Sequence, residues 1–452
     1  MAVAMLVLLA PQDARSARSS GHAAPGPAQG EAAGGRVIDA DPSSYLRLLQ
    51  ALKPGDTLRL APGIYDPPGG PPGLPVFDMH GTADAPITIS GPASGPRAIF
   101  IGEARHNTIR IANASHVVLR DLDIDARDRG GDGVNGQGPS HHITLDGLSI
   151  RGVGGSQQVV GISTNRAPAW NWIIRRTTII GAGTGMYLGN SDGANPFVNG
   201  LIEHNLIVDS LGYNLQVKHQ APWPEGAGLP TDTTHTVIRH NVFSKQRNSS
   251  GGAMARPNLL VGDVPSTGPG KDNGYRIYGN FFYQNPTEAL FQGEGNVAFY
   301  SNLLVNDAGP GILMRRHNGS LREALVFGNT IVSSGPGITL RVGHPAYRQR
   351  AIGNAVFSSD KALVASDASH NLVDRQERAP HYLRNPLSPL PALDLKPRGS
   401  EAAGAPVDAD ALGELPDVEL DFDGRRRDWS YRGAYTGGAD DARWTPQLAI
   451  KP

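Results

Sequence analysis

The sequence of 452 residues contains no cysteine. This absence excludes disulfide bonds, thiolate catalysis and zinc sites built on cysteine. Net charge is also nearly absent, because 41 Lys and Arg residues stand against 42 Asp and Glu residues. No overall field therefore attracts nucleic acid or an anionic membrane, and any electrostatic recognition must be local.

Long apolar runs are absent as well. The longest candidate is the short run of residues 1–10, which is too short to span a membrane. A stretch rich in Pro, Ala, Gly and Ser follows it, with small-residue cleavage sites near Ala24. We therefore expect residues 1–34 to be a signal peptide or a disordered tail, and the protein to be secreted or periplasmic.

Gly and Pro are abundant, at 57 and 36 positions. Residues that interrupt regular structure at this frequency exclude a long-helix bundle and a coiled coil. Because 39% of the residues are still hydrophobic, the composition indicates a folded, turn-rich protein dominated by β-structure.

A short apolar strand with one small polar residue inside it recurs from residue 117 to residue 356. The polar markers recur about every 29 residues: Asp121, Gly147, Thr177, Asn205, Asn241, Asn280, Asn302, Asn329 and Asn354. Each interval holds two short β-rich segments and no apolar run long enough for a helix, which favours a coil of strands. Stacked coils, about 4.8 Å apart, predict a parallel solenoid. We interpret the repeated Asn as a structural ladder.

Both ends of the repeat region resemble a known family. The segments LLQALKPGDTLRLAPGIYDPP, from Leu48, and GTADAPITISGP, from Gly81, resemble the opening coil of β-helix polysaccharide lyases of the chondroitinase B and alginate lyase type. The segments DLKPRGSEAAGAP, from Asp394, and DFDGRRRDWSYRGAYTGG, from Asp421, resemble the tail of secreted β-helix proteins.

This resemblance implies an all-β fold, a single-stranded right-handed parallel β-helix over residues 35–380. It further implies a short N-terminal capping helix over residues 43–52. Residues 381–452 would then form an irregular C-terminal segment that packs on the last coils.

The second strand of each repeat begins after a small residue. Its first and third positions are apolar, and we expect them to face the core, as for Tyr213 with Leu215 and for Ala253 with Ala255. The fourth and sixth positions then face solvent and form a polar stripe with a cationic bias: Gln216, Lys218, Arg256, Asn258, Gln292, Glu294, Arg315, His317 and Arg341. Such a face suits an extended anionic polymer, so we expect an acidic polysaccharide as the partner.

The lyase resemblance also implies a catalytic pair. It gives Lys218, in LQVKHQ, the role of the base and Arg256, in GGAMARPN, the role of the Arg that lies across the scissile bond. One coil and two residues along a strand separate their Cα atoms by about 8 Å, so both side chains would reach one sugar ring. β-Elimination from a uronate needs such a base and a cation to stabilise the developing charge. Arg256, Arg239 and His219 are expected to lower the pKa of Lys218, and Arg239 and His219 are also expected to bind the substrate.

Two features around this pair leave alternatives open. Trp223 lies among Pro and Gly residues and would either stack on a sugar or cover the edge of the solenoid.

No metal is required for the reaction. The calcium ligands of the resembling lyases have no clear match, and Glu203, Glu225 and Asp232 are only loosely placed candidates.

Two rival functions are compatible with the same sequence. A β-helix glycoside hydrolase would use paired carboxylates such as Asp128 and Asp132, from the Asp-rich segment that begins at Asp121. A non-catalytic protein of polysaccharide binding or exopolysaccharide processing would bind without forming a product. We expect a monomer, and the identity of the sugar and its linkage is not encoded in any motif.

Overall fold

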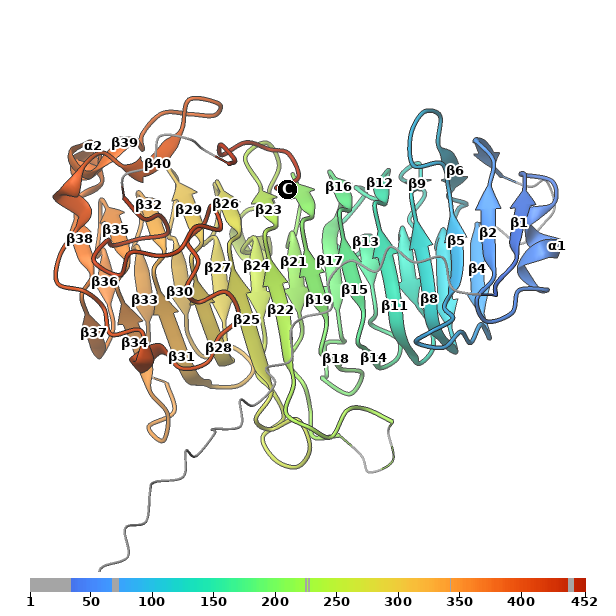
Figure 1. The fold of residues 1–452 in the computed structure, drawn as a ribbon, viewed down its shortest axis with the longest axis horizontal. Coiled ribbons are helices and arrows are strands. Elements are labelled where there is room, and N and C mark those ends of the chain that lie inside the picture. Colours follow the sequence, from blue (N-terminus) through green and yellow to red (C-terminus); the bar gives the residue numbers. More distant parts are fainter. Residues whose placement is uncertain (1–33, 67–72, 224–225, 227, 342, 438–442) are drawn as a thin grey trace, which may run out of the picture.

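The computed structural model describes residues 34–66, 73–223, 226, 228–341, 343–437 and 443–452, so the expected signal peptide lies outside the described residues. The chain forms a parallel β-helix, as the sequence predicts (Figure 1). Each coil contributes one strand to each of three long sheets, which we name A, B and C in the order in which the chain visits them. No described helix is long and apolar enough to cross a membrane.

Sheet A is the largest of the three. Its strands, in order, are β1 (Val37–Ala40), β2 (Thr57–Leu60), β5 (Ile87–Ser90), β8 (Ala114–Arg120), β11 (Ser140–Asp146), β15 (Ile173–Arg175), β19 (Leu201–Glu203), β22 (His235–Arg239), β25 (Gly274–Tyr278), β28 (Gly295–Tyr300), β31 (Leu321–Phe327), β34 (Gln349–Ile352) and β37 (Asp367–Ser369). Two short strands, β14 (Ala169–Trp170) and β18 (Phe197–Val198), extend it beside β11.

Sheet B follows A in each coil. Its strands are β3 (Gly63–Tyr65), β6 (Ala98–Ile101), β9 (Leu122–Asp125), β12 (Ser149–Arg151), β16 (Thr178–Ile180), β20 (Leu206–Val208), β23 (Val242–Ser244), β26 (Phe281–Tyr283), β29 (Leu303–Asn306), β32 (Thr330–Ser333), β35 (Ala355–Ser358) and β38 (Leu372–Asp374).

Sheet C completes each coil. Its strands are β4 (Leu74–Phe77), β7 (Ile109–Ala112), β10 (Val134–Gly136), β13 (Val160–Ser163), β17 (Thr184–Leu188), β21 (Leu215–Val217), β24 (Leu259–Val261), β27 (Phe291–Gly293), β30 (Ile312–Met314), β33 (Ile338–Leu340) and β36 (Leu363–Val364).

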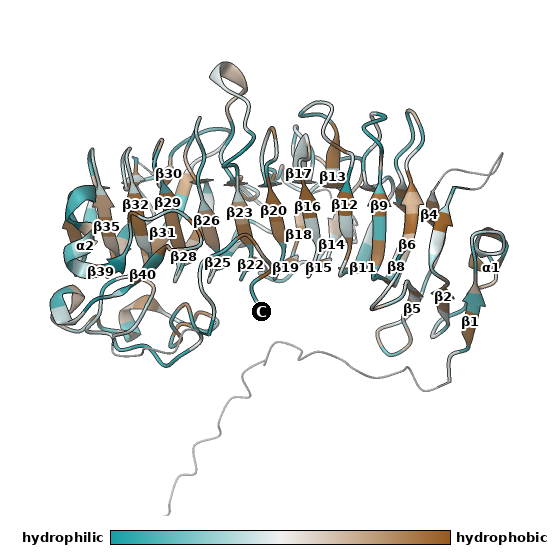
Figure 2. Cartoon of the chain, turned by 90° about the horizontal axis from the view of Figure 1, so that it is seen from above, coloured by the Kyte–Doolittle hydropathy of each residue, from teal (hydrophilic) through white to brown (hydrophobic). Residues whose placement is uncertain are grey.

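The core is a stack of apolar side chains that point inward from all three sheets. In the middle of sheet B, one inward position is apolar in nine successive coils and almost fully buried: Ile124, Ile150, Ile179, Ile207, Phe243, Phe282, Leu304, Ile331 and Val356. Apolar colouring is concentrated on the strands, whereas many of the connecting loops are hydrophilic (Figure 2). Parallel pairing with aligned side chains buries the apolar face that a single coil would leave in water.

The repeated Asn residues form the predicted ladder between sheets A and B. The Asn280 amide, for example, accepts hydrogen bonds from the Asn241 backbone and side chain and donates to the carbonyl of Ile238 at 2.9 Å. The ladder runs through fully buried positions Asn205, Asn241, Asn280, Asn302, Asn329 and Asn354 and ends at Asn371. These side chains satisfy backbone groups at the bend of each coil, so they are structural.

A short helix α1 (Tyr45–Leu49) lies at the N-terminal end of the solenoid and buries Tyr45 and Leu49. It is shorter than the expected span of residues 43–52. The Asp41 carboxylate accepts hydrogen bonds from the backbone N–H groups of Ser43 and Ser44, both at 2.9 Å, just before the helix begins.

The C-terminal segment begins with α2 (Ala379–Tyr382), β39 (Leu383–Asn385) and β40 (Asp394–Pro397), and it returns along the outside of the solenoid. Phe422, Tyr435 and Trp444 pack on the outer face of sheet B, and Val407 and Leu412 pack on that of sheet A. The segment reaches beyond the last coils to the middle of the solenoid, where the Lys451 ammonium donates to the carbonyl of Gly279. It therefore covers sheets A and B over the C-terminal half.

The ladder predicts a large loss of stability when one rung is removed. We expect Asn280→Ala to destabilise the fold by about 3 kcal/mol, because it leaves the buried Asn241 N–H and the Ile238 carbonyl without partners. Chemical denaturation of the purified variant measures this loss. The exposed Asn318→Ala is the matched control. Equal free energies of unfolding for the two variants would contradict a structural role of the Asn ladder.

Candidate active site

Two rows of outward-facing residues run along sheet C. In-register pairing aligns Tyr187, Gln216, Leu260, Gln292, Leu313 and Thr339 in the first row. The residues that directly follow the paired positions Leu188, Val217, Val261, Gly293, Met314 and Leu340 form the second: Gly189, Lys218, Gly262, Glu294, Arg315 and Arg341. The second row is the cationic one, and it contains Lys218.

The register differs from the predicted one around Arg256. Residues 253–258 were expected to form a strand with Ala253 and Ala255 inward. Instead Gly252–Met254 is a 3-10 helix, Ala255 is only half-buried, and the strand is β24, from Leu259. Pro257 cannot donate to a ladder, and Leu259 and Val261 supply the buried positions. Arg256 therefore comes from a loop before β24.

Arg256 nevertheless lies within electrostatic range of Lys218. Its guanidinium Nη1 donates to the carbonyls of Ala253 at 2.9 Å and Ala255 at 2.7 Å, and its Cζ lies 5.9 Å from the centroid of the Tyr213 ring. Its charge is close enough to lower the pKa of Lys218. The charge of Arg256 thus acts on Lys218 from a loop and not from the expected strand.

Lys218 is a half-buried ammonium. Its Nζ lies 5.7 Å from the centroid of the Tyr187 ring, on the outer face of sheet C. Burial holds the pKa of Lys218 below its ordinary value, the positive charge of Arg256 lowers it further, and the carboxylate of Glu294 opposes this shift. A larger fraction of Lys218 is therefore uncharged at a given pH than for a lysine in water.

Lys245 is a buried residue that holds the loop of Arg256 in place. Its side chain is fully buried and its Nζ donates to the backbone carbonyl of Arg256 at 2.8 Å. The side-chain amide of Asn285 donates to the same carbonyl at 2.9 Å. Burial, followed by the charge of Arg256, lowers the pKa of Lys245 to about 7. Two donors on one carbonyl fix the loop that carries Arg256.

Glu294 organises the loop that holds the next cations. Its carboxylate accepts hydrogen bonds from the backbone N–H groups of His317, Asn318 and Gly319. Arg315 and His317 are exposed on this loop, and Arg341 is exposed one coil further along. His219, next to Lys218, is half-buried, and burial lowers its pKa.

Four residues predicted to bind substrate lie elsewhere or are covered. Asn258 is fully buried and its carbonyl oxygen accepts from Asn285, so it belongs to the interior. Gln216 is outward but only 2% exposed, and it hydrogen-bonds Tyr213. Trp223 is buried against Val198 and Leu229, which is the edge-covering role.

Arg239 is the fourth correction. It extends from β22 of sheet A, where it pairs with Glu203 at 2.8 Å and donates to the Tyr278 hydroxyl at 3.0 Å. It therefore faces away from sheet C and does not tune Lys218. Glu203 is committed to this ion pair, Asp232 is exposed, and Glu225 lies outside the described residues.

The two carboxylates expected for a hydrolase, Asp128 and Asp132, both accept hydrogen bonds from backbone groups. Asp132 accepts hydrogen bonds from Asn135, Ser163 and the Val160 N–H, so its carboxylate holds the adjoining coil. Asp128 accepts from the Gly154 N–H in an exposed turn. The Asp128 carboxylate therefore holds the backbone at Gly154, and the Asp132 carboxylate holds the backbone at Val160.

Three residues near Lys218 were not predicted as site residues. Tyr187 was assigned no role, Tyr213 was expected in the core, and Lys245 was overlooked. The polar end of Tyr213 was an available signal, whereas Lys245 lies in the polar stretch SKQRNSS, which does not mark it as a site residue.

No protein-family model and no curated protein matches the sequence. Solved structures with a similar fold include pectate lyase Pel9A, at 12% identity over 92% of this chain and 96% of its own, with a TM-score of 0.38. The alginate lyase from Paenibacillus sp. str. FPU-7 has 17% identity over 75% of this chain and 99% of its own, with a TM-score of 0.33. The GH136 lacto-N-biosidase from Eubacterium ramulus has 11% identity over 75% and 68%, with a TM-score of 0.37. At these values the similarities carry no argument about the reaction.

Gly262 is required for the position of Lys218. A β-carbon at this residue would lie 2.3 Å from the His219 backbone nitrogen and 2.8 Å from the Lys218 carbonyl carbon. We expect Gly262→Ala to destabilise the protein by about 1–3 kcal/mol, as overpacking does. Thermal unfolding measures the change, with Gly155→Ala, where a β-carbon meets nothing within 4 Å, as the control. If Gly262→Ala were as stable as this control, the close packing of Gly262 against the backbone of Lys218 and His219 would be contradicted.

Proposed function

We propose that this protein is an exported polysaccharide lyase that cleaves an anionic, uronate-containing polymer by β-elimination. The observation that carries the proposal is the half-buried Lys218, whose pKa is lowered by burial and by Arg256 on an open row of sheet C. A lysine that loses its proton more easily than usual, next to a fixed cation, suits proton abstraction beside a carboxylate.

In the proposed reaction, the uncharged Nζ of Lys218 takes the proton from the carbon next to the uronate carboxyl group. The electron pair forms a C=C double bond, and the glycosidic C–O bond on the neighbouring carbon breaks. The leaving oxygen receives a proton from the Lys218 ammonium formed in the first step. Arg256 stabilises the negative charge that builds on the carboxylate.

The polymer would follow the cationic row. Arg315 and Arg341 lie three and four coils beyond Lys218, about 14 and 19 Å away at about 4.8 Å per coil. This spacing is too long for the same bond and suits neighbouring uronates. His317 lies on the loop of Arg315 and would extend the same contact.

A panel of acidic polysaccharides tests the function. The lyase yields an unsaturated product with new ultraviolet absorbance. New reducing ends without that absorbance would favour a hydrolase, and binding without any product would favour a non-catalytic protein. Either outcome would overturn the proposal.

Loss of the base should stop the chemistry. We expect Lys218→Ala to lower kcat by about 100- to 10,000-fold on a substrate that the parent cleaves, because general-base catalysis contributes this much. Steady-state kinetics measures the change, and Lys361→Ala, at an exposed lysine outside the cationic row, should leave kcat unchanged. Full activity of Lys218→Ala would refute the role of Lys218.

Loss of a distant cation should weaken binding instead. We expect Arg315→Ala to raise KM by about tenfold, equivalent to about 1.4 kcal/mol, with kcat little changed. The melting temperature should not change, since Arg315 is exposed. A drop in kcat with constant KM would place Arg315 at the scissile bond and contradict the proposed path of the polymer.

A further inference from the structure

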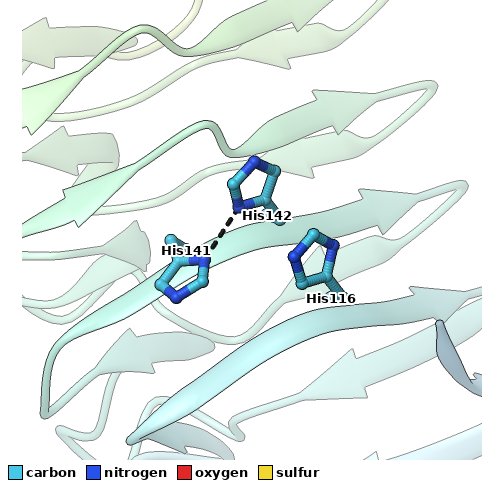
Figure 3. Close-up of side chains that lie close together, drawn as sticks. All are labelled: His116, His141 and His142. Carbon is cyan, nitrogen blue, oxygen red and sulfur yellow. Dashed lines mark hydrogen bonds between the residues drawn. The ribbon is translucent and has the colours of Figure 1, made fainter. Parts of the chain in front are cut away.

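Three histidines gather on the outer face of sheet A, away from the cationic row of sheet C. His116 lies on β8, and His141 and His142 lie on the adjacent strand β11 (Figure 3). The parallel register pairs Ser115 with His141 and Val117 with Ile143, which sets His116 opposite His142. The three histidines, from two adjacent coils, thus lie next to one another on sheet A.

The backbone is bent at this point in both strands. His116 and His142 have positive φ angles of 52° and 53°. In a regular strand His141 and His142 would point to opposite faces, but the left-handed bend turns both rings outward. Only His142 is largely exposed, while His116 and His141 are half-buried.

The three rings are arranged closely. The rings of His116 and His142 stack with centroids 4.3 Å apart, and the Nδ1 atoms of His141 and His142 lie 2.7 Å apart. One nitrogen from each ring lies within 4.8 Å of the others.

Neighbouring residues hold the rings in place. The Asn171 amide donates to Nε2 of His142 at 3.0 Å, and the Asn199 amide donates to Asn171 at 2.7 Å. Trp170 stacks on His141, with ring centroids 4.7 Å apart. Histidine ligands of metal ions donate their far N–H to a partner, so in a metal-bound state the Asn171 side chain would present its oxygen to His142 in place of its NH2 group.

We propose that His116, His141 and His142 form a binding site for a divalent transition metal ion of the zinc type. Tetrahedral Zn²⁺, at 2.0–2.1 Å from each nitrogen, sets ligand nitrogens about 3.3 Å apart, so small rotations of the rings suffice. If His142 binds through Nδ1, its proton moves to Nε2. The Asn171 side chain then turns over so that its oxygen accepts this proton, and the Asn199 amide turns with it so that its oxygen accepts from Asn171. Three protein ligands leave one position open for water. The ion would join two coils of the solenoid.

This site is independent of the proposed lyase function, and its test uses untagged, chelator-treated full-length protein. We expect Co²⁺ to give the visible absorption of a nitrogen-ligated site with one equivalent bound, and Zn²⁺ to displace it and to raise the melting temperature by about 2 °C. His116→Asn and His142→Asn keep the positive φ, which Asn tolerates. They, and His141→Ala, should weaken metal binding by about 100-fold or more.

His106→Ala is the matched control, because His106 is exposed and lies outside the cluster. It should bind Co²⁺ as the parent does. The absence of a Co²⁺ spectrum in the parent, or unchanged binding in all three cluster variants that still unfold cooperatively, would overturn the site. Failure of the lyase assays would leave these outcomes unaffected.

Discussion

Parallel hydrogen bonding between successive coils determines which side chains of the three sheets face the core and which face outward. Once Leu215 pairs with Leu259, the whole of sheet C is in register, and the residue after each paired segment falls on one row. A shift of one residue would turn that row inward. The buried Asn ladder holds the same register at the bend between sheets A and B, where backbone groups would otherwise lack partners.

The C-terminal segment decides which faces of the solenoid remain available. Its apolar residues, among them Phe422 and Trp444, cover sheet B, and Val407 covers part of sheet A. Arg239 on sheet A is consequently drawn into a network with Tyr278 and Asp417. The cationic row with Lys218 lies on sheet C, outside both covered clusters.

Periodicity made the fold and the Asn ladder predictable from the sequence, because the alternation of apolar residues and the spacing of Asn280 and its counterparts depend only on local pattern. The site was less predictable. Arg256 precedes β24 in a loop that replaces the expected strand, and the burial of Asn258 and Trp223 depends on contacts with residues distant in sequence. The role of Lys245 could not be predicted, because it depends on a hydrogen bond to the Arg256 carbonyl that only the folded structure forms.

The proposed function depends most on the lowered pKa of Lys218, and NMR titration of ¹³C-labelled lysine side chains measures this pKa directly. The chain has only seven lysines, and Lys218→Arg identifies the resonance. We predict a pKa for Lys218 below the ordinary value of 10.5, which rises in Arg256→Gln because a neighbouring positive charge is removed. A pKa at or above 10.5 that does not respond to Arg256→Gln would contradict the account.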